Sequence, residues 1–298
     1  MKSNKKMISV TIGIIAYNEQ VTISPLVASL LRQNSDKFRL INIIIISDGS
    51  TDNTANVIKG LRNAKIKLMT HKDKKGKSLR INEIFRKADT DITVILDADI
   101  QMENDLVISN LVMPFTSDAH LQLVSGTIVP QTPTTFTQKV ILAGHQIMHE
   151  AKKMVKNRNV YECTGAIRAF RKKLYKELKF PAVTAEDIFP YLYCVSKSYR
   201  YRTVKDARVF YTLAATYRDY KTQMNRYLAS PREHSELFAE NMVQNQFTIN
   251  TTIKLRALVI TLVKNPFWTF MYLCYLAVPK IETLINPKVQ GGMWDVSR

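Results

Sequence analysis

The chain has 298 residues, of which 46% are apolar, so it is long enough to bury a sizeable core and its composition excludes a disordered protein. Its formal charge of +18 and its pI near 9.7 predict attraction to polyanions, namely nucleic acid, anionic lipid or phosphate-bearing substrates. The cysteines Cys163, Cys194 and Cys274 have the spacing of neither a zinc site nor a disulfide framework, which indicates a reducing, cytosolic setting.

Residues 1–100 alternate short apolar runs with amphipathic segments, a pattern typical of βαβ units around a parallel sheet. The start mimics a signal peptide, but its apolar run is short and lacks a cleavage site, so we interpret it as a buried strand. The predicted fold class is α/β, with a Rossmann-like, mostly parallel sheet, helices on both faces, and ligands beyond the carboxyl ends of the strands. We expect strands at 8–15, 41–46, 66–69 and 92–96, and helices at 20–33, 52–61 and 78–87.

The pattern changes after Asp99, and the following segment should hold the second substrate. We expect a helix at 103–112, a strand at 121–128, a long basic helix at 136–157 and a strand at 205–213. These elements predict a catalytic domain at 1–235, with a nucleotide-binding half at 1–100 and an acceptor half at 101–235. A helical tail follows at 236–298.

The tail contains two apolar runs, 255–263 and 267–278, which Lys264-Asn265-Pro266 separates. Each run is shorter than the roughly twenty residues that a membrane-spanning helix needs, which favours attachment at the membrane interface. Trp268, Tyr272 and Tyr275 are aromatic residues of the kind found at that interface. A kinked or re-entrant insertion, a pair of core helices and a dimer surface are the alternatives.

Two acidic motifs follow predicted strands. In Ser47-Asp48-Gly49-Ser50-Thr51-Asp52, Asp48 stands where a carboxylate can accept hydrogen bonds from a uracil N–H or a ribose hydroxyl, although the motif is also that of a capped turn. In Asp97-Ala98-Asp99, two carboxylates face the same side. Their repulsion calls for a cation, and Mg²⁺ is typically held by one or two carboxylates together with substrate phosphates. Lys75-Gly76-Lys77 opens a helix where an anion can bind, or forms an ordinary basic loop.

These motifs, preceded by Ile14-Ile15-Ala16-Tyr17-Asn18-Glu19 and followed by Thr184-Ala185-Glu186-Asp187, occur in an order that resembles family 2 glycosyltransferases with the GT-A fold. The resemblance covers about residues 8–232. It implies an inverting transfer from a nucleoside-diphosphate sugar, usually a uridine one, with Mg²⁺ or Mn²⁺. It also implies roles for single residues: Tyr17 and Glu19 at the base and ribose, Asp48 at the uracil, Lys77 near the nucleotide, Asp97 at the ribose or diphosphate, Asp99 at the metal, and Glu186-Asp187 as the acidic pair that contains the catalytic base Asp187.

General chemistry supports a base and a metal. A sugar hydroxyl is a poor nucleophile until a base removes its proton, and a diphosphate leaves poorly until its charge is neutralised. Inversion needs no protein nucleophile, because the acceptor attacks the anomeric carbon from the face opposite the leaving group. Without the other motifs, Glu186-Asp187 could equally be an acidic pair at a helix N-terminus.

Two further segments resemble parts of the same family on the acceptor and diphosphate side. The segment that contains Gly165 leads into Phe170-Arg171 and is similar to a glycine segment beside the acceptor. Gln223, Arg226 and Tyr227 resemble the Gln-x-x-Arg-Trp element of chain-building synthases, with Tyr227 in place of Trp. That departure argues against processive synthesis. Ser47 also replaces a position that is often acidic.

The remaining basic and imidazole groups give weaker indications. His145, His149 and Glu150 could share a metal, but a surface or core pair is the preferred interpretation. Basic segments in the acceptor half lead us to expect an anionic membrane surface, a glycan or polyprenyl-linked acceptor, and a place at the cytoplasmic face of the cell membrane. No nucleic acid is expected. A nucleotidyltransferase and a non-catalytic polyanion-binding protein are the competing hypotheses, although the first lacks its glycine-rich phosphate loop and the second leaves the acidic motifs unexplained.

Overall fold

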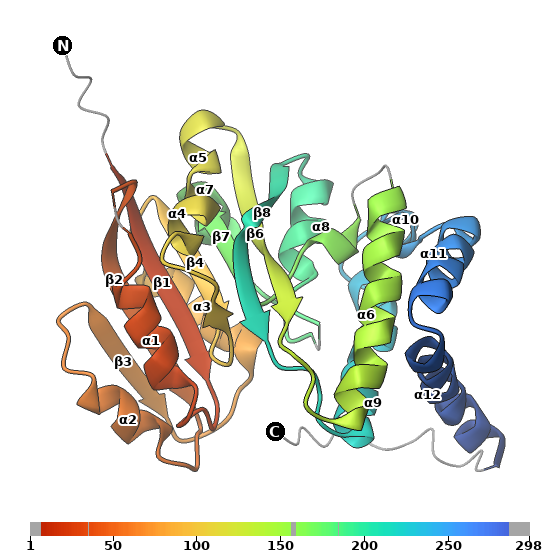
Figure 1. Cartoon of the computed structure of the whole chain (residues 1–298). Helices are drawn as coiled ribbons and strands as arrows, with labels where there is room; N and C mark the ends of the chain where they lie inside the picture. The colour runs from red at the N-terminus through yellow and green to blue at the C-terminus, as the bar shows by residue number, and fades with distance from the viewer. Residues whose placement is uncertain (1–6, 35, 156–158, 184, 286–298) are drawn as a thin grey trace. The chain divides into compact units, whose positions relative to one another are not determined.

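A central sheet of eight strands organises the chain (Figure 1). The computed structural model describes residues 7–34, 36–155, 159–183 and 185–285. Thr184 of the last acidic motif, residues 1–6 and the end of the predicted helix at 136–157 lie outside these ranges. The strand order is β3-β2-β1-β4-β7-β6-β8-β5. The bounds are β1 Ile8–Ala16, β2 Phe38–Asp48, β3 Ile66–His71, β4 Ile92–Asp97, β5 Gln101–Met102, β6 Leu121–Pro130, β7 Ile167–Arg171 and β8 Arg200–Tyr211.

The sheet is mixed, so the expectation of a mostly parallel sheet is correct only for its first half. Strands β3, β2, β1 and β4 are parallel. Strand β7 is antiparallel to both β4 and β6, and β5 is antiparallel to β8. Helix α6 (Phe136–Met154) and a single 3-10 turn, η1 (Val160–Glu162), lie between β6 and β7, and the antiparallel direction of β7 is seen only in its pairing with β4 and β6. The four strands predicted in residues 1–100 are all present.

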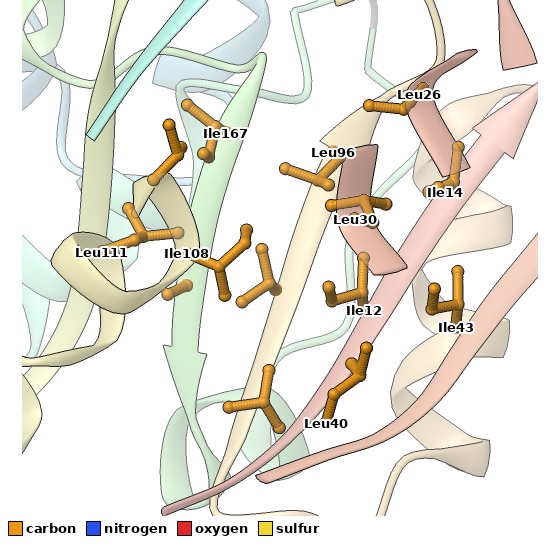
Figure 2. Close-up of a cluster of buried hydrophobic side chains, with 14 of the residues drawn as sticks. Ile12, Ile14, Leu26, Leu30, Leu40, Ile43, Leu96, Ile108, Leu111 and Ile167 are labelled. Atoms are coloured by element: carbon orange, nitrogen blue, oxygen red, sulfur yellow. The ribbon is translucent and has the colours of Figure 1, made fainter. Parts of the chain in front are cut away.

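Helices cover both faces of the sheet, as predicted. On one face α1 (Ile23–Leu31), α2 (Thr54–Gly60) and α4 (Val107–Val112) pack apolar side chains against β1, β2 and β4. Figure 2 shows this core, with Leu26 and Leu30 of α1 and Ile108 and Leu111 of α4 among strand residues. The other face is covered by α3 (Lys77–Lys87), α7 (Lys172–Glu177) and α8 (Phe189–Ser196).

Several elements differ from the sequence-based expectation. The predicted helix at 103–112 is shorter, because β5 and a turn occupy its first residues and α4 begins at Val107. The short elements β5, β7, α5 (Pro114–Ser117), α7 and α8 were not predicted as separate elements. Each contains eight residues or fewer, which is too short for a periodic pattern to be distinct.

The chain divides into two compact units, and the first contains the sheet. Unit 1 comprises residues 1–129, 159–212 and 226–247, and unit 2 comprises residues 130–158, 213–225 and 248–298. Helix α10 (Glu240–Phe247) belongs to unit 1, and α9 (Tyr217–Ser235) runs from one unit into the other. Because compactness does not show which parts fold independently, the predicted boundary at residue 235 remains a prediction.

Unit 2 contains three longer helices, α6 (Phe136–Met154), α11 (Thr251–Lys264) and α12 (Pro266–Ile285). Thr135 and Gln138 form a capping box that begins α6. The hydroxyl-bearing ring of Tyr272 on α12 lies so close to Gly144 on α6 that a Cβ there would be 2.3 Å from it. Asn265, between α11 and α12, donates to Gln146 at 2.9 Å.

Helices α11 and α12 expose many large apolar side chains. Leu255, Val259 and Leu262 are spaced along one face of α11 and exposed, whereas Ala257 and Thr261 on the opposite face are buried. The exposed large apolar residues of the two helices are Leu255, Val259, Leu262, Val263, Phe267, Phe270, Leu273 and Leu276. Among the described residues we find no helix with both the length and the apolar character that a membrane crossing requires.

Candidate active site

Two loops at the carboxyl ends of β1 and β2 are held to each other by hydrogen bonds. Asn18 has a left-handed backbone with φ of 57°, and its side-chain oxygen accepts from Thr51 N at 2.8 Å. The side-chain oxygen of Gln20 accepts from Asn53 N at 3.0 Å, and the backbone N–H of Glu19 donates to the Thr54 hydroxyl at 2.8 Å. Asparagine tolerates a left-handed backbone better than most residues do, so the motif residue Asn18 suits this turn.

The predicted nucleotide residues Tyr17 and Glu19 lie on the first of these loops. The Lys74 ammonium sits 3.6 Å from the centre of the Tyr17 ring, so this ring already serves as a cation–π platform. Burial raises the pKa of Glu19, and the charges of Asp99 and Asp97 act in the same direction against a hydrogen bond from Thr22. Glu19 is therefore brought close to the Asp-x-Asp motif.

Asp48 is enclosed by its own chain. Its side chain is buried, and its oxygens accept from Lys75 N at 3.0 Å, from Gly76 N at 2.8 Å and from Arg80 Nε at 2.6 Å. Gly49 has φ of 73°, and a Cβ there would lie 2.6 Å from Lys74 N, so this turn requires glycine. Asp48 thus fixes the loop that precedes α3, and its predicted contact with uracil remains untested by the geometry.

Lys77, the first residue of α3, connects two acidic motifs. Its Nζ lies 2.5 Å from Asp97 Oδ1 and 2.8 Å from Glu186 Oε1. Burial alone would lower the pKa of Lys77, but the charges of Asp97 and Glu186 outweigh it and raise the pKa. A lysine that is charged at all physiological pH values therefore links the end of β4 to the loop before α8.

Asp97 and Asp99 were predicted to hold the diphosphate and a metal. Desolvation and the neighbouring Asp97 charge raise the pKa of Asp99, so this carboxylate lacks a full counter-charge of its own. A divalent cation would supply that charge, and an Asp-x-Asp pair that leaves positions for phosphate oxygens suits Mg²⁺ or Mn²⁺. Within the described ranges no three His, Cys, Asp or Glu side chains gather into a complete metal cage. The donor set fits a cation that a bound diphosphate helps to hold.

The acidic pair Glu186-Asp187 lies between α3 and β7. Burial would raise the pKa of Glu186, but the charges of Lys77 and Arg168 outweigh it and lower the pKa. Burial and the Glu186 charge raise the pKa of Asp187 to about 6. A carboxylate with this pKa is ionised at neutral pH and is a stronger base than an ordinary aspartate.

Gly165 stands directly against Asp187. A Cβ at this glycine would lie 2.6 Å from Asp187 Cβ and 3.1 Å from its Oδ2. The predicted acceptor-side glycine and the predicted base are therefore neighbours, and only a residue without a side chain leaves room for this Asp187 conformation.

The three residues of the Gln-x-x-Arg-Tyr element fall in different units. Tyr227 and Arg226 belong to unit 1, and the negative charge of Asp187 raises the pKa of Tyr227. Tyr227 is thus near the predicted base, and the Arg226 charge opposes the shift. Gln223 belongs to unit 2.

Arg168 is a residue of this site that sequence reasoning did not single out. It is fully buried on β7, its Nη1 donates to the Asp187 carbonyl oxygen at 3.3 Å, and its Nη2 lies 3.8 Å from Glu186 Oε1. The available signal was a single charge inside the apolar run Ile167-Arg168-Ala169-Phe170.

The histidine pair on α6 is not a metal site among the described residues. Partial desolvation and the charge of Lys152 lower the pKa of His145. Burial also lowers the pKa of His149. A core or surface pair stays our interpretation of His145 and His149.

Comparison with known proteins identifies a family match. The profile described as Glycosyl transferase family 2 matches residues 11–179, more than half of the chain. The poly-beta-1,6-N-acetyl-D-glucosamine synthase of Staphylococcus aureus is 30% identical over 118 residues, which make up 39% of this chain and 28% of that protein. The chain thus spans less than a third of the length of this curated relative.

Solved structures with the same fold extend over more of the chain. A mannosyltransferase from Pyrobaculum calidifontis, in complex with GDP-Man and Mn²⁺, has a TM-score of 0.64 and 18% identity, covering 95% of this chain and 82% of that one. TarS from S. aureus in complex with UDP-GlcNAc has a TM-score of 0.54 and 18% identity, covering 70% of this chain and 60% of that one. At such identities the likeness establishes the fold alone.

Proposed function

The chain belongs to glycosyl transferase family 2 and has the GT-A-like α/β fold that its motifs predict, and from this premise we propose that it is an inverting glycosyltransferase. It moves a sugar from a UDP-sugar to a hydroxyl of a glycan or lipid-linked acceptor in cell-surface polysaccharide synthesis. The polysaccharide synthase and the UDP-GlcNAc-bound TarS among its relatives support this choice of donor and pathway. Family membership argues against a nucleotidyltransferase and against a non-catalytic polyanion-binding protein.

The observation that carries this proposal is the link that Lys77 makes between Asp97 and Glu186. Sugar transfer needs a site that holds a diphosphate and a base that serves the acceptor, and the two must lie near each other. Lys77 joins the motif expected to hold the diphosphate to the pair that contains the expected base. These motifs are separated by almost ninety positions in the sequence, so their convergence is a property of the fold.

In the proposed reaction, Asp187 accepts the proton of the acceptor hydroxyl as that oxygen attacks the anomeric carbon. With a pKa raised to about 6, Asp187 is ionised at neutral pH and ready to act. Attack opposite the diphosphate inverts the anomeric configuration without a protein nucleophile. Asp99, with Asp97 beside it, would hold a Mg²⁺ or Mn²⁺ ion, which neutralises charge on the leaving diphosphate. The Mn²⁺ in the complex of the mannosyltransferase from Pyrobaculum calidifontis supports this choice of ion.

We test this function by measuring release of nucleoside diphosphate from a panel of UDP- and GDP-sugars, with Mn²⁺ or with EDTA. We expect metal-dependent release from a UDP-sugar. Asp187→Asn should reduce release by about 10²–10⁴-fold while UDP binding persists, because amide and carboxylate have nearly the same shape. Asp206→Asn, which removes an exposed carboxylate from β8, is the matched control and should behave as wild type. Equal release by wild type and Asp187→Asn would refute Asp187 as the base.

We further propose that the chain works at the cytoplasmic face of the cell membrane, with the exposed apolar surface of α11 and α12 resting among anionic lipid headgroups. The side chains described in unit 2 include eight basic residues against the two acidic residues Glu150 and Asp219. The basic residues are Lys139, Lys152, Lys153, Arg218, Lys221, Lys254, Arg256 and Lys264. Apolar side chains beside an excess of cations are the combination that binds anionic bilayers.

Vesicle sedimentation tests this attachment. We expect binding to vesicles that contain phosphatidylglycerol, weaker binding to neutral phosphatidylcholine vesicles, and loss of binding at high salt. Val259→Ser on α11 should weaken binding, whereas Val21→Ser, which changes an even more exposed valine in unit 1, should not. Equal binding to both kinds of vesicle at low salt would refute the proposal. A dimer in analytical ultracentrifugation that Val259→Ser dissociates would assign the surface to a second copy of the chain.

A further inference from the structure

Arg168 occupies an unusual position for a charged residue. It lies in the middle of β7, paired with Ile95 of β4 on one side and with Ser125 of β6 on the other. Its side chain is 0% exposed, and the neighbouring Ile167 and Ala169 point into the apolar core on the opposite face of the sheet. Arginine is almost never fully buried unless it is paired, so the surroundings of its guanidinium must explain it.

The Arg168 guanidinium faces Glu186 and Asp187, but only part of its hydrogen-bonding capacity is used. Nη1 donates to the Asp187 carbonyl oxygen at 3.3 Å, and Nη2 lies 3.8 Å from Glu186 Oε1, in ion-pair range but beyond a hydrogen bond. Nε and Nη2 have no hydrogen-bond partner in the part of the chain that the structure describes. Burial of such a charge opposes folding, and an apolar residue of similar volume would pack here without that penalty. A residue that conflicts with its local environment indicates a functional requirement.

That requirement follows from the charges around Asp187. The groups that act on it are Glu186 in the same loop, Lys77 of α3, Asp97 of β4 and Arg168 of β7, and Tyr227 of α9 is close enough to be affected by it in turn. Three carboxylates thus face two cations, which leaves one negative charge in excess. Lys77 is shared between Asp97 and Glu186, which leaves Arg168 as the second positive charge for the adjacent pair.

We propose that Arg168 is a positioning residue for the base: it anchors the main chain at Asp187 and supplies the positive charge that balances the two adjacent carboxylates. This inference rests on the proposed function, because it assigns Arg168 a task in proton transfer. Removal of the guanidinium leaves Asp97, Glu186 and Asp187 with Lys77 alone. One carboxyl then binds a proton more readily, and Asp187, whose pKa is already raised, is the one that does so.

Three variants test the proposal. Arg168→Met keeps the length of the side chain and removes its charge, and Arg168→Lys keeps the charge and loses the planar donors. Arg202→Met is the matched control, since it removes an exposed arginine from β8 in the same unit. For each variant we measure UDP binding with Mn²⁺ by calorimetry and release of UDP from the best UDP-sugar donor across pH.

The expected results distinguish a role of Arg168 in positioning the base from a role in stabilising the fold alone. In Arg168→Met the acid limb of the pH–rate profile should move up by about one pH unit, with turnover recovering at alkaline pH and UDP affinity changing less than about twofold. Arg168→Lys should keep the acid limb near its wild-type position, because the charge remains. Its turnover should be lower than that of wild type, because the planar donors are lost. Arg202→Met should match wild type. An unmoved acid limb in a folded Arg168→Met protein would overturn the proposal, as would an equal loss at every pH. If Arg168→Met does not fold, an acid limb in Arg168→Lys that moves up by a full unit overturns it.

A second measurement does not depend on turnover. Carbon-13 NMR of the aspartate carboxyl groups, assigned with Asp187→Asn, reports protonation of Asp187 directly. We expect its midpoint to move to higher pH in Arg168→Met and to stay in Arg202→Met. If wild type releases no nucleoside diphosphate but this shift occurs, the proposed function fails while the charge balance stands. If wild type is active and the midpoint does not move, the inference about Arg168 fails alone.

Discussion

The raised pKa of Asp187 predicts how activity depends on pH. Burial and the Glu186 charge raise this pKa to about 6. A base must be ionised to accept a proton, so activity is present above the pKa and is lost as the pH falls through it. For a single proton, about 90% of Asp187 is ionised at pH 7 and about 10% at pH 5, so kcat/KM should fall roughly tenfold between these values. An unperturbed aspartate would change ionisation by less than about 10% over the same interval.

The assay is kcat/KM for the UDP-sugar between about pH 4.5 and 8.5 at constant ionic strength, since kcat/KM reports the free enzyme. Asp99 also has a raised pKa, so the measurement is repeated at several Mn²⁺ concentrations. An acid limb that belongs to Asp187 stays in place as Mn²⁺ rises, whereas one that belongs to Asp99 moves to lower pH. A flat profile down to about pH 4.5, or the same limb in the residual activity of Asp187→Asn, would refute the reasoning.

Three further predictions concern single side chains. Gly165→Ala should lower turnover by about a hundredfold with UDP affinity retained in calorimetry, because its Cβ would lie 2.6 Å from Asp187 Cβ; unchanged turnover would contradict the contact. Asp48→Ala should cost about 3 kcal/mol in urea unfolding, since it removes the buried partner of Arg80; a cost below about 1 kcal/mol would show that the pair is dispensable. Asp99→Ala should weaken Mn²⁺-dependent UDP binding by at least about tenfold in calorimetry; equal affinity would exclude it as the ligand.

Much of the first half of the fold follows from local sequence. The strands β1, β2 and β4 are built around apolar runs that end in polar turns, and a strand buried on both faces needs that pattern. The edge strand β3 is shorter and less buried, but Ile66, Leu68 and Met69 still mark it. The antiparallel β7 has only five residues, Ile167–Arg171, and its direction is set by pairing with β4 and β6. Pairing between strands distant in the sequence leaves no local signal, so the mixed character of the sheet was not predicted.

Sequence motifs predicted which residues belong to the candidate site, but they did not predict which residues these side chains contact. Asp97, Glu186 and Asp187 belong to recognisable motifs. The fold brings Asp97 and Glu186 into contact with Lys77. The environment of Asp48 could not be read from sequence, because a buried carboxylate that accepts from Arg80 and two backbone N–H groups looks the same as one that faces a nucleotide. The role of Arg168 could not be predicted either. A single charge within an apolar strand is explained only by its partners Glu186 and Asp187, which come from a distant loop.

The hydrogen bonds of Asn18 and Gln20 have a consequence for redesign of this enzyme. Because Asn18 accepts from Thr51 and Gln20 accepts from Asn53, the turn after β1 and the turn after β2 hold each other's shape. Neither turn can be exchanged alone without unpaired backbone groups in the other. An attempt to graft a different nucleotide preference from another transferase would therefore have to transplant both turns as a single cassette, even though more than thirty residues of chain separate them.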